Sequence, residues 1–564
     1  MLAMMFFAGV AGAAGQTALP GETAVERPYL LFPVENANTP ATEKCCVDIC
    51  ATNGDVLHSI VLPIAADGKG AWTGTVDMRA FLGSNVVLKL VKGSEGRLKF
   101  LRPSDRRGDP PGLYQEPNRL QFHFSPPVGF MNDPNGLVYV DGEWRMLFQH
   151  APYTFASPWQ GASQYWGYAT SRDLVHWTNH GDVMRPYPGQ HNLISGSGVV
   201  DVNNTAGFGK GAHINCVVGA SPRGSGMLLY FSTDGRTFTP DPANPHQCAR
   251  QGFGGDPKVI WHEPTKRWIA VTWGVKENCC VQHFHSSPDL RTWTYESTYY
   301  GDHYASRKRA SFLFECPGIA ELGIVGEKGT AWVVWEAGAL YSVGSFDGHV
   351  FSPLADHERL LAYPQSTHLP YYAGQAFQNV PGGRCVYIPW YMLHGDGPHF
   401  AQHMGLPQEL ALVRIGAGLR LTRRPVRELE ALRDGVAVPF DVFAGELVEG
   451  RVSVQATKAT RVVMNLRGVE VVYDAADERL SCAGEKVHWP LRDNRLDLRF
   501  FLDRQGLECF SESGFDCWAF RRAKPVAGNL KLSAKAVDAK SAQFTAWKLK
   551  SIWNRNPAGM AKID

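Results

Sequence analysis

The sequence of 564 residues predicts an all-β protein, in which a small N-terminal β module precedes a five-bladed β-propeller and a C-terminal β-sandwich follows it. Three observations predict this fold: a repeat of about sixty residues, strand-like alternation with little helical periodicity, and a composition rich in glycine and aromatic residues. The 58 Gly, 16 Trp and 19 Tyr suit a protein with many tight turns between sheets. The length is sufficient for two or three domains.

The repeat consists of a serine, an aspartate two residues later and an aromatic residue four positions beyond the aspartate. Its aspartates lie 61, 55 and 58 residues apart. Because Asp and Gly favour turns and aromatic residues favour strands, each copy is expected to form the same corner of a repeated sheet. The four copies are Ser171–Trp177, Ser232–Phe238, Ser287–Trp293 and Ser345–Phe351.

The segments between the copies alternate in the way expected of antiparallel strands. Leu137–Val140 and Trp144–Phe148 flank Asp141-Gly142, a dipeptide favoured in hairpin turns. About four strands per repeat, arranged radially, form a β-propeller. The span of residues 115–425, divided by the length of the repeat, gives five blades.

Two further β regions flank the expected propeller. Residues 20–106 contain strand-like runs and end where proline and charged residues cluster, at Arg102–Pro111. After the propeller, a short linker helix is expected over residues 426–438. Residues 439–564 are expected to form the sandwich, since the alternation in Leu496–Leu502 suits a half-buried antiparallel strand.

The first residues have the character of an export signal. Residues 1–18 are apolar and small, and Ala11-Gly12-Ala13 is typical of a cleavage region, which predicts a signal peptide and a secreted or periplasmic protein. No Lys or Arg precedes this segment, as in a signal peptide with a truncated start. No other stretch is apolar enough to cross a bilayer, so no membrane insertion is expected.

Charge and cysteine content disfavour several other classes of protein. The formal net charge is +2 and no basic stripe is present, which argues against nucleic-acid partners. The twelve cysteines lack the paired CxxC spacing of zinc sites, and no metal is expected. They are either buried thiols or members of a few disulfides.

Polar residues recur at the period of the blades. Asp133, Ser195, Asp256, Glu315 and Gln375 are separated by 62, 61, 59 and 60 residues. In a propeller such positions come one from each blade and can converge on the central channel. Carboxylates gathered there repel one another, so one should hold its proton at neutral pH, as glycosidic cleavage requires. The alternative is a polar channel holding water or calcium, but no loop with several oxygen ligands is apparent.

The longer phrases around these positions resemble glycoside hydrolase family 32, the invertase, inulinase and levanase family. The clearest is Phe122–Gly136, FHFSPPVGFMNDPNG, and the matches follow the order of the family over about residues 120–550. The supporting phrases are Trp166–Trp177, Ser195–Ser197, Asp256–Lys258, Phe314–Pro317, Val343–Gly348, Gly405–Leu410, Arg424–Leu429 and Phe501–Arg504. The resemblance implies the same architecture, a five-bladed propeller followed by a sandwich.

The resemblance also implies roles for particular residues. Asp133 matches the nucleophile, Glu315 the acid/base and Asp256 the carboxylate that stabilises the transition state. The positions that match the fructose pocket are Asn132, Gln149, Trp159, Ser195 and Trp390. The spacing of Trp159 to Trp166 is longer than usual, so a structural tryptophan at a blade edge is the alternative there. No metal or organic cofactor is implied.

Two positions depart from the pattern of the family. Phe130 stands where a tryptophan is usual, which keeps an aromatic ring. Gly255 stands where an arginine precedes Asp-Pro, and glycine supplies neither charge nor hydrogen bonds. Arg250 or another residue could reach the site instead, or the protein could act on different substrates or catalyse poorly.

The expected function is therefore release of fructose from levan, inulin or sucrose by an exo-acting, retaining hydrolase. Three alternatives remain: a fructan-binding pseudoenzyme, which the departure at Gly255 motivates, a fructosyltransferase with the same site, and an enzyme acting on arabinans. The sandwich and the Asn-Asp-Pro-Asn phrase disfavour the last. The N-terminal module either binds carbohydrate or packs against the catalytic domain, and packing is favoured. The sequence makes no prediction of oligomeric state.

Overall fold

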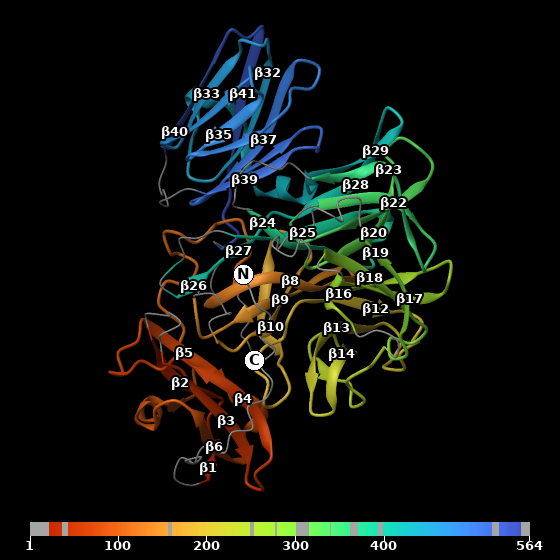
Figure 1. The fold of residues 1–564 in the computed structure, drawn as a ribbon. Coiled ribbons are helices and arrows are strands. Elements are labelled where there is room, and N and C mark those ends of the chain that lie inside the picture. The colour runs from red at the N-terminus through yellow and green to blue at the C-terminus, as the bar shows by residue number, and fades with distance from the viewer. Residues whose placement is uncertain are drawn as a thin grey trace.

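The computed structural model divides the chain into three β-rich bodies (Figure 1). It describes residues 22–35, 43–155, 161–248, 253–276, 279–300, 315–338, 340–360, 370–392, 397, 399–521 and 530–553. The predicted signal peptide over 1–18, Trp159 and Arg250 lie outside these residues. No helix in the described part of the chain has the length and apolar character needed to span a membrane.

The N-terminal module contains two sheets that face each other across an apolar core (Figure 1, red). Alternation of buried and half-exposed residues along its strands fits sheets with one face toward that core. One sheet has the order β1 (Thr23–Ala24), β6 (Asn85–Lys92), β3 (Cys45–Ala51), β4 (Val56–Leu62). The other has the order β5 (Trp72–Asp77), β2 (Tyr29–Val34), β7 (Arg102–Ser104). The short 3-10 helices η1 (Arg79–Phe81) and η2 (Glu95–Phe100) connect them.

Five antiparallel sheets follow and form the predicted propeller. Blade 1 is β8 (Gly129–Val140), β9 (Glu143–Ala151), β10 (Tyr165–Ser171), β11 (Trp177–Met184). Blade 2 is β12 (Gly196–Asp201), β13 (Ala212–Ser221), β14 (Gly224–Ser232), β15 (Thr239–Pro240). Blade 3 is β16 (Gly255–His262), β17 (Arg267–Lys276), β18 (Cys279–Ser287), β19 (Thr294–Tyr299). Blade 4 is β20 (Gly318–Gly323), β21 (Thr330–Trp335), β22 (Leu340–Phe346), β23 (Phe351–Leu360). Blade 5 is β24 (Tyr371–Ala376), β25 (Cys385–Tyr391), β28 (Gln408–Ile415), β29 (Gly418–Pro425), with η4 (Pro381–Gly383) between its first two strands and β27 (His403–Met404) pairing with β25.

The ring closes through a strand from the end of the propeller. β26 (Phe400–Ala401) follows β25 in the chain but pairs in parallel with β8 of blade 1. A second bridge joins Val138 of β8 to Gln378, just after β24. The last blade is therefore hydrogen-bonded to the first, which fixes the inner strands around one axis.

The repeated turn forms the same corner in each of four blades, as predicted. Each copy ends the third strand of its blade, and the aspartate accepts backbone N–H groups two and three residues later: for Asp173, from Val175 at 3.1 Å and His176 at 2.7 Å. The residue after the aspartate has a positive φ in every copy, which glycine adopts without strain. These residues are Leu174 (62°), Gly235 (68°), Leu290 (63°) and Gly348 (95°).

The predicted linker helix over 426–438 is wrong beyond Leu432. A 3-10 helix, η5, spans Arg427–Leu432, and β30 (Arg433–Pro439) follows it directly. Gly435 has a φ of 87° and the remaining residues include β-branched valines, so this stretch favours extended backbone over a helix. β30 pairs with the last strand of the described chain and so belongs to the sandwich.

The C-terminal sandwich has two six-stranded sheets around an apolar core (Figure 1, blue). In the first sheet β30 is followed by β41 (Ser541–Leu549), β32 (Val448–Gln455), β37 (Arg495–Leu502), β38 (Gly506–Ser511) and β39 (Cys517–Arg521). The second has the order β31 (Ala444–Gly445), β40 (Leu530–Val537), β33 (Arg461–Leu466), β34 (Val469–Asp474), β35 (Arg479–Cys482), β36 (Glu485–His488). The 3-10 helix η6 (Phe440–Val442) lies between β30 and β31.

Both outer bodies are hydrogen-bonded to the propeller. The N-terminal module meets blade 1, where the rings of Phe32 and Tyr153 pack edge to face at 5.5 Å between centroids. Three hydrogen bonds accompany this contact: Val61 N–H to Ser163 Oγ at 2.8 Å, Gly189 N–H to Ser59 Oγ at 2.9 Å, and Tyr165 Oη with His58 Nε2 at 3.2 Å. These contacts agree with a packing role for the module.

A buried histidine joins the propeller to the sandwich. His123 Nδ1 lies 3.0 Å from Asp503 Oδ2, and its Nε2 contacts Glu508 Oε1. Burial opposes a charge on this ring, but the hydrogen bonds and negative charges of both carboxylates raise the pKa of His123 to about 9. Further hydrogen bonds to these carboxylates come from the backbone of Gln121, Phe122 and Leu406 and from the hydroxyl of Tyr371.

The cysteines are thiols wherever the structure describes their side chains. Eleven cysteines have described side chains, and ten of them are buried. Of the two alternatives left by the sequence, the described cysteines therefore follow the first and behave as small apolar core residues.

Candidate active site

The five polar residues at the blade period lie at the innermost strands. Asp133, Asp256 and Gln375 lie within β8, β16 and β24, while Ser195 immediately precedes β12 and Glu315 lies three residues before β20. Each of these strands is the first of its blade in chain order. Four of them lie at the edge of their sheet, and β8 lies between β9 and β26. The spacing therefore brings one side chain from each blade toward the propeller axis.

Irregular backbone marks three of these inner strands. The register with the neighbouring strand shifts between Met131 and Pro134 and between Gly255 and Lys258, on either side of the two aspartates. A third shift lies between Tyr372 and Gln375 in blade 5. Such bulges re-aim a side chain that would otherwise alternate between the faces of the sheet. Asp133 and Asp256 both lie within such an irregular stretch.

Three non-glycine residues at or near the start of the innermost strands of blades 3, 4 and 5 adopt the left-handed backbone conformation. The φ angles are 50° for Asp256, 46° for Cys316 and 50° for Ala373. Each such residue costs of the order of 1 kcal/mol, and such residues persist where surrounding contacts hold them. Their clustering at one end of three adjacent blades is typical of a functional site.

Asp133 is buried and held by three neighbours. Ser195 Oγ donates to its Oδ2, and Asn132 Nδ2 lies 3.2 Å from its Oδ1. The thiol of Cys316 lies 3.4 Å from the same Oδ2. Asn132 also donates to Gln149 Oε1, so both predicted pocket amides belong to one network with the carboxylate.

The thiol sulfur of Cys316 contacts the carboxylates of both Asp256 and Asp133. Cys316 Sγ is 3.5 Å from Asp256 Oδ2, and the backbone N–H of Cys316 lies 3.3 Å from that oxygen. The indole N–H of Trp273 donates to it at 2.7 Å. The two aspartates therefore flank the residue that follows Glu315 in the chain.

Glu315 completes the cluster from blade 4. Its side chain is partly exposed, and the hydroxyl of Tyr372 donates to its Oε2 at 2.8 Å. Its carbonyl oxygen accepts the backbone N–H of Ala337 at 2.8 Å, which ties the residue to the end of β21. Tyr372 lies in β24, so blades 4 and 5 both contribute to the placement of this carboxyl group.

Glu315 holds its proton more tightly than the two aspartates do. Burial raises the pKa of Asp133 to about 6, and the charge of Glu315 acts in the same direction. Burial and the charge of Asp133 raise the pKa of Asp256 to about 6. Burial and the charge of Asp256 raise the pKa of Glu315 to about 7. Between these values the aspartates ionise while Glu315 keeps its proton, which is the arrangement needed for a nucleophile opposite an acid.

Aromatic rings form the wall beside Glu315. Trp390 packs edge to face against Tyr372 and against Phe130, with ring centroids 6.2 and 6.3 Å apart, and its N–H lies 3.3 Å from Gln402 Oε1. Phe130 thus fills an apolar position next to the predicted pocket residue Trp390. Trp159 lies outside the described residues.

Sequence reasoning missed four neighbours of the carboxylates: Gln164, Trp273, Cys316 and Tyr372. Gln164 Nε2 donates to Asn132 Oδ1 at 3.0 Å and extends the amide network. Cys316 lies in Phe314–Pro317, one of the segments that resemble the family, and directly follows the periodic Glu315. Tyr372 lies three residues before the periodic Gln375. The blade period could therefore have indicated both residues. Trp273 carries no such signal, because its position depends on the pairing of β16 with β17.

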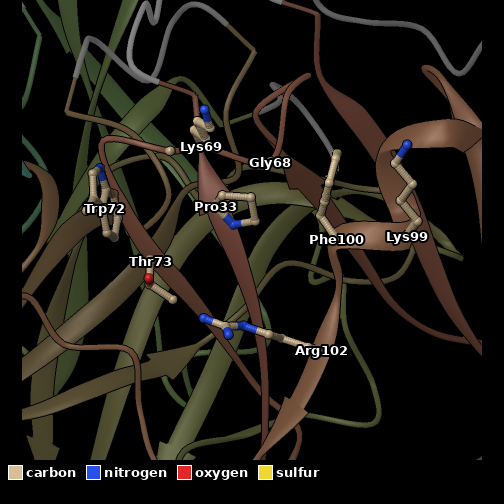
Figure 2. Close-up of a pocket in the computed structure, with 9 residues that line it drawn as sticks. Pro33, Gly68, Lys69, Trp72, Thr73, Lys99, Phe100 and Arg102 are labelled. Carbon is tan, nitrogen blue, oxygen red and sulfur yellow. The ribbon is translucent and has the colours of Figure 1, made fainter.

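A separate cavity of about 520 Å³ lies in the N-terminal module (Figure 2). Figure 2 shows Trp72 and Thr73 on one side and Lys99, Phe100 and Arg102 on the other. Its lining residues include three cationic side chains and no carboxyl group. This cavity therefore lacks groups for carboxylate acid/base chemistry, and the candidate active site is the cluster in the propeller.

The described residues contain no group of three or more His, Cys, Asp or Glu side chains arranged to hold a metal ion. The carboxylates of Asp133 and Asp256 accept hydrogen bonds from amide, hydroxyl, indole and thiol donors. These donors suit orientation of carboxylates and recognition of sugar hydroxyls.

Curated relatives share extensive similarity with the chain. Levanase of Bacillus subtilis is 27% identical over 508 residues, covering 79% of this chain and 72% of the relative. Extracellular exo-inulinase of Aspergillus niger is 30% identical over 372 residues, covering 55% of this chain and 65% of the relative. Invertase 1 of Saccharomyces cerevisiae is 33% identical over 295 residues, 48% of this chain and 53% of the relative. The chain thus spans about half to three quarters of the length of these relatives.

Solved structures share the fold. Exo-inulinase from Aspergillus awamori superposes with a TM-score of 0.67 at 24% identity, covering 78% of this chain and all of that one. Fructofuranosidase from Schwanniomyces occidentalis, complexed with fructose, gives a TM-score of 0.66 at 22% identity, again covering 78% of this chain. The five-bladed propeller followed by a sandwich is therefore common to these proteins.

The family model described as the N-terminal domain of glycosyl hydrolases family 32 matches residues 123–425. This range begins at the histidine that contacts the sandwich and ends with the last strand of blade 5, so it contains every carboxylate of the cluster. The match covers more than half of the 564 residues. The chain belongs to glycosyl hydrolase family 32.

Proposed function

We propose that the chain releases fructose from β-fructofuranosides such as levan, inulin or sucrose, by retaining, exo-acting hydrolysis. The observation that carries the mechanism is the contrast between Asp133 and Glu315. Asp133 lies in the inner strand of blade 1 and Glu315 lies just before that of blade 4. The pKa of Asp133 is raised to about 6 and that of Glu315 to about 7. The substrate class follows from relatives named levanase, exo-inulinase and invertase.

In the first displacement, a carboxylate oxygen of Asp133 attacks the anomeric carbon of the terminal fructosyl unit. Glu315 donates its proton to the glycosidic oxygen as the bond to the leaving group breaks. A covalent fructosyl-enzyme forms, and the leaving sugar departs as an alcohol. The hydrogen bond from Ser195 holds the nucleophile in place for this attack.

In the second displacement, Glu315 acts as a base. It takes a proton from water, which attacks the same carbon and breaks the bond to Asp133. Two inversions leave the anomeric configuration unchanged. A retaining mechanism places the two carboxyl groups roughly 5–5.5 Å apart, and this separation is expected of Asp133 and Glu315.

Asp256 is assigned the third role. Its carboxylate accepts hydrogen bonds from ring hydroxyls, and these bonds strengthen as positive charge develops on the sugar. Asn132, Gln149 and Ser195 supply polar contacts to the same ring, and Trp390 supplies an apolar wall. Trp159 is proposed to line the pocket on the basis of the family resemblance alone.

Two alternatives use the same site. A fructosyltransferase would pass the fructosyl unit to a sugar instead of water. A fructan-binding pseudoenzyme is motivated by Gly255, which lacks the arginine of the family pattern. Asp133 and Asp256 are buried beside Cys316, which directly follows the partly exposed Glu315, and this grouping of three carboxyl groups favours catalysis over binding alone.

The test is fructose release by wild type, Asp133→Asn and Glu315→Gln on sucrose, inulin and levan. Either substitution is expected to lower turnover by a factor of the order of 10⁴ or more while the melting temperature changes little, because the reaction depends on both groups. Product analysis distinguishes the modes: free fructose alone indicates exo attack, and a ladder of oligosaccharides indicates endo attack. Unchanged release by either variant refutes the assignment.

Export is proposed as well, from the apolar segment over 1–18. Relatives include proteins named extracellular exo-inulinase. Expression of the full chain with a C-terminal tag in a bacterial host tests this. Tagged protein in the periplasm or medium, shortened at its N-terminus, is expected, and full-length protein confined to the cytoplasm contradicts export.

A further inference from the structure

The residues before Asp256 lie beneath a tryptophan of the neighbouring strand. Gly255 is the direct cross-strand partner of Trp273. A Cβ atom on Gly255 would lie 2.3 Å from Trp273 Nε1, and one on Gly254 would lie 1.6 Å from the carbonyl oxygen of Trp273. A side chain at position 255 would overlap the indole, and one at position 254 would overlap the backbone of the same tryptophan. The indole of Trp273, from β17, thus occupies the space that a side chain on residue 255 would need.

The same indole holds the carboxylate of the next residue. Trp273 Nε1 donates to Asp256 Oδ2 at 2.7 Å, and both side chains are less than 10% exposed. Among the described residues, every hydrogen bond to this carboxylate ends on Oδ2, with Cys316 supplying the others. Oδ1 accepts none of these hydrogen bonds.

The backbone of Asp256 requires such support. Its φ of 50° is unfavourable for a residue with a side chain, and the register shift on this strand frees it from regular pairing with β17. A short hydrogen bond from a buried, rigid ring restricts the rotation of the carboxylate about its side-chain bonds. Of the donors to Asp256, the indole approaches most closely.

We propose that Trp273 is a positioning residue for the transition-state carboxylate Asp256, and that Gly255 is glycine in order to admit its indole. This inference rests on the proposed function and specifies how its third carboxylate is oriented. Where the family pattern leads one to expect an arginine next to Asp-Pro, the donor in this chain comes from the neighbouring strand.

Blade 4 offers a matched control for this arrangement. Gly318 is the cross-strand partner of Trp335, and a Cβ atom on Gly318 would lie 1.9 Å from that indole. The indole N–H of Trp335 donates to the carbonyl oxygen of Gly374 at 3.2 Å and not to a carboxylate. Trp335→Phe therefore removes an equivalent buried N–H without affecting Asp256.

The experiment compares Trp273→Phe with Trp335→Phe, using sucrose as substrate. Trp273→Phe is expected to lower kcat/KM about 10- to 100-fold, as loss of a hydrogen bond to a buried charged group does. The acidic limb of its pH profile should move to higher pH, because the lost N–H favoured the ionised form of Asp256. Trp335→Phe should keep the position of the limb. Equal kcat/KM and equal limbs in the two variants overturn the proposal.

A second pair of variants covers the case in which Trp273→Phe does not fold. Gly255→Ala is expected to displace the indole and move the acidic limb in the same direction. Gly318→Ala, with the same steric conflict in blade 4, should not move the limb. If the acidic limb of the kcat/KM profile lies at the same pH in Gly255→Ala as in Gly318→Ala, the proposal is contradicted.

One readout is independent of activity. The indole N–H resonance of Trp273, assigned by its loss in Trp273→Phe, should titrate with Asp256 near pH 6 and lose this titration in Asp256→Asn. A titrating indole in an enzyme that releases no fructose supports the contact and contradicts the proposed function alone. A silent indole in an active enzyme contradicts this inference alone.

Discussion

At the scale of single residues, the three carboxyl groups predict a narrow pH range for activity. Asp133 must be ionised to attack and Asp256 to stabilise the transition state, and the pKa of each is about 6. Glu315 must be protonated to assist departure, and its pKa is about 7. The profile of kcat/KM is therefore expected to be bell-shaped, with limbs near pH 6 and 7. Initial rates of fructose release between pH 4 and 9 check this, and a flat profile across pH 5–8 contradicts it.

Tyr372 provides a second prediction at this scale. Its hydroxyl donates to Glu315 Oε2 and favours the ionised form of that group. Tyr372→Phe should raise the pKa of Glu315, move the alkaline limb of kcat/KM to higher pH and lower kcat about 10-fold. Tyr391→Phe is the control, because its buried hydroxyl donates to the carbonyl oxygen of Phe520 instead. An alkaline limb in the same place for both variants contradicts a role for Tyr372.

The periodicity of the sequence predicted which polar residues lie on the inner strands. Asp133, Asp256 and Glu315 meet because each lies in, or just before, the innermost strand of its own blade. The contact of Trp273 with Asp256 could not be predicted in this way. It depends on a register shift between Gly255 and Lys258, and a bulge of this kind leaves no periodic trace in the sequence.

At the scale of structural elements, the N-terminal module supports a segment that reaches the site. Ser163 accepts the N–H of Val61 from the module, and the next residue, Gln164, donates to Asn132 beside the nucleophile. Ser163→Ala leaves a buried N–H without its partner, which costs about 1–3 kcal/mol. It is expected to lower the melting temperature by a few degrees and to raise KM for sucrose.

The matched control for this prediction is Ser59→Ala. Ser59 accepts the N–H of Gly189 across the same contact between module and propeller, and the loop after Gly189 meets Gln164 through backbone hydrogen bonds of His191 and Leu193. Ser59→Ala removes the hydrogen bond from Gly189 and should lower the melting temperature without changing KM for sucrose. Thermal melts and Michaelis profiles of both variants separate the effects, and an equal KM in both shows that the module does not position the site.

The repeated turn and the linker differ in how far the sequence predicts them. In each copy of the turn the aspartate side chain itself caps the corner, so the residues that form the pattern also cause the structure. The stretch after Leu432 has helix-forming neighbours but pairs with β41 instead. That pairing joins segments more than a hundred residues apart, and local propensity contains no information about it.

At the scale of the whole molecule, His123 predicts how stability depends on pH. Its pKa of about 9 in the folded chain exceeds the usual value of about 6.5 for an unfolded chain. Folding therefore favours the charged ring, and this stabilisation is complete below about pH 6.5 and is lost as the pH rises towards 9. The melting temperature should fall over this range, and differential scanning calorimetry at closely spaced pH values measures it.

The comparison variant is His123→Gln, which cannot carry the charge. It should be less stable at pH 6, because Asp503 and Glu508 lose their buried counter-ion, and its melting temperature should change less between pH 6.5 and 9. An equally steep fall in the variant shows that other groups cause the pH dependence.

The sandwich itself was predicted, but its attachment to the propeller was not. His123 and Asp503 lie in two phrases that carry the family resemblance, 380 residues apart, and the structure shows that these phrases meet in one buried ion pair. Sequence resemblance indicates that such phrases matter, and only the fold shows that one of them holds two domains together.

The proposed retaining mechanism requires a covalent bond between Asp133 and fructose. β-Fructofuranosyl fluoride needs no acid to leave, so Glu315→Gln should accept its fructosyl unit quickly and release it slowly, because the base for hydrolysis is missing. Mass spectrometry of the quenched, digested variant should then find one fructosyl unit on the peptide that contains Asp133. A fructosyl unit on the Asp256 peptide, or fructose formed with inverted configuration and no labelled peptide, contradicts the claim.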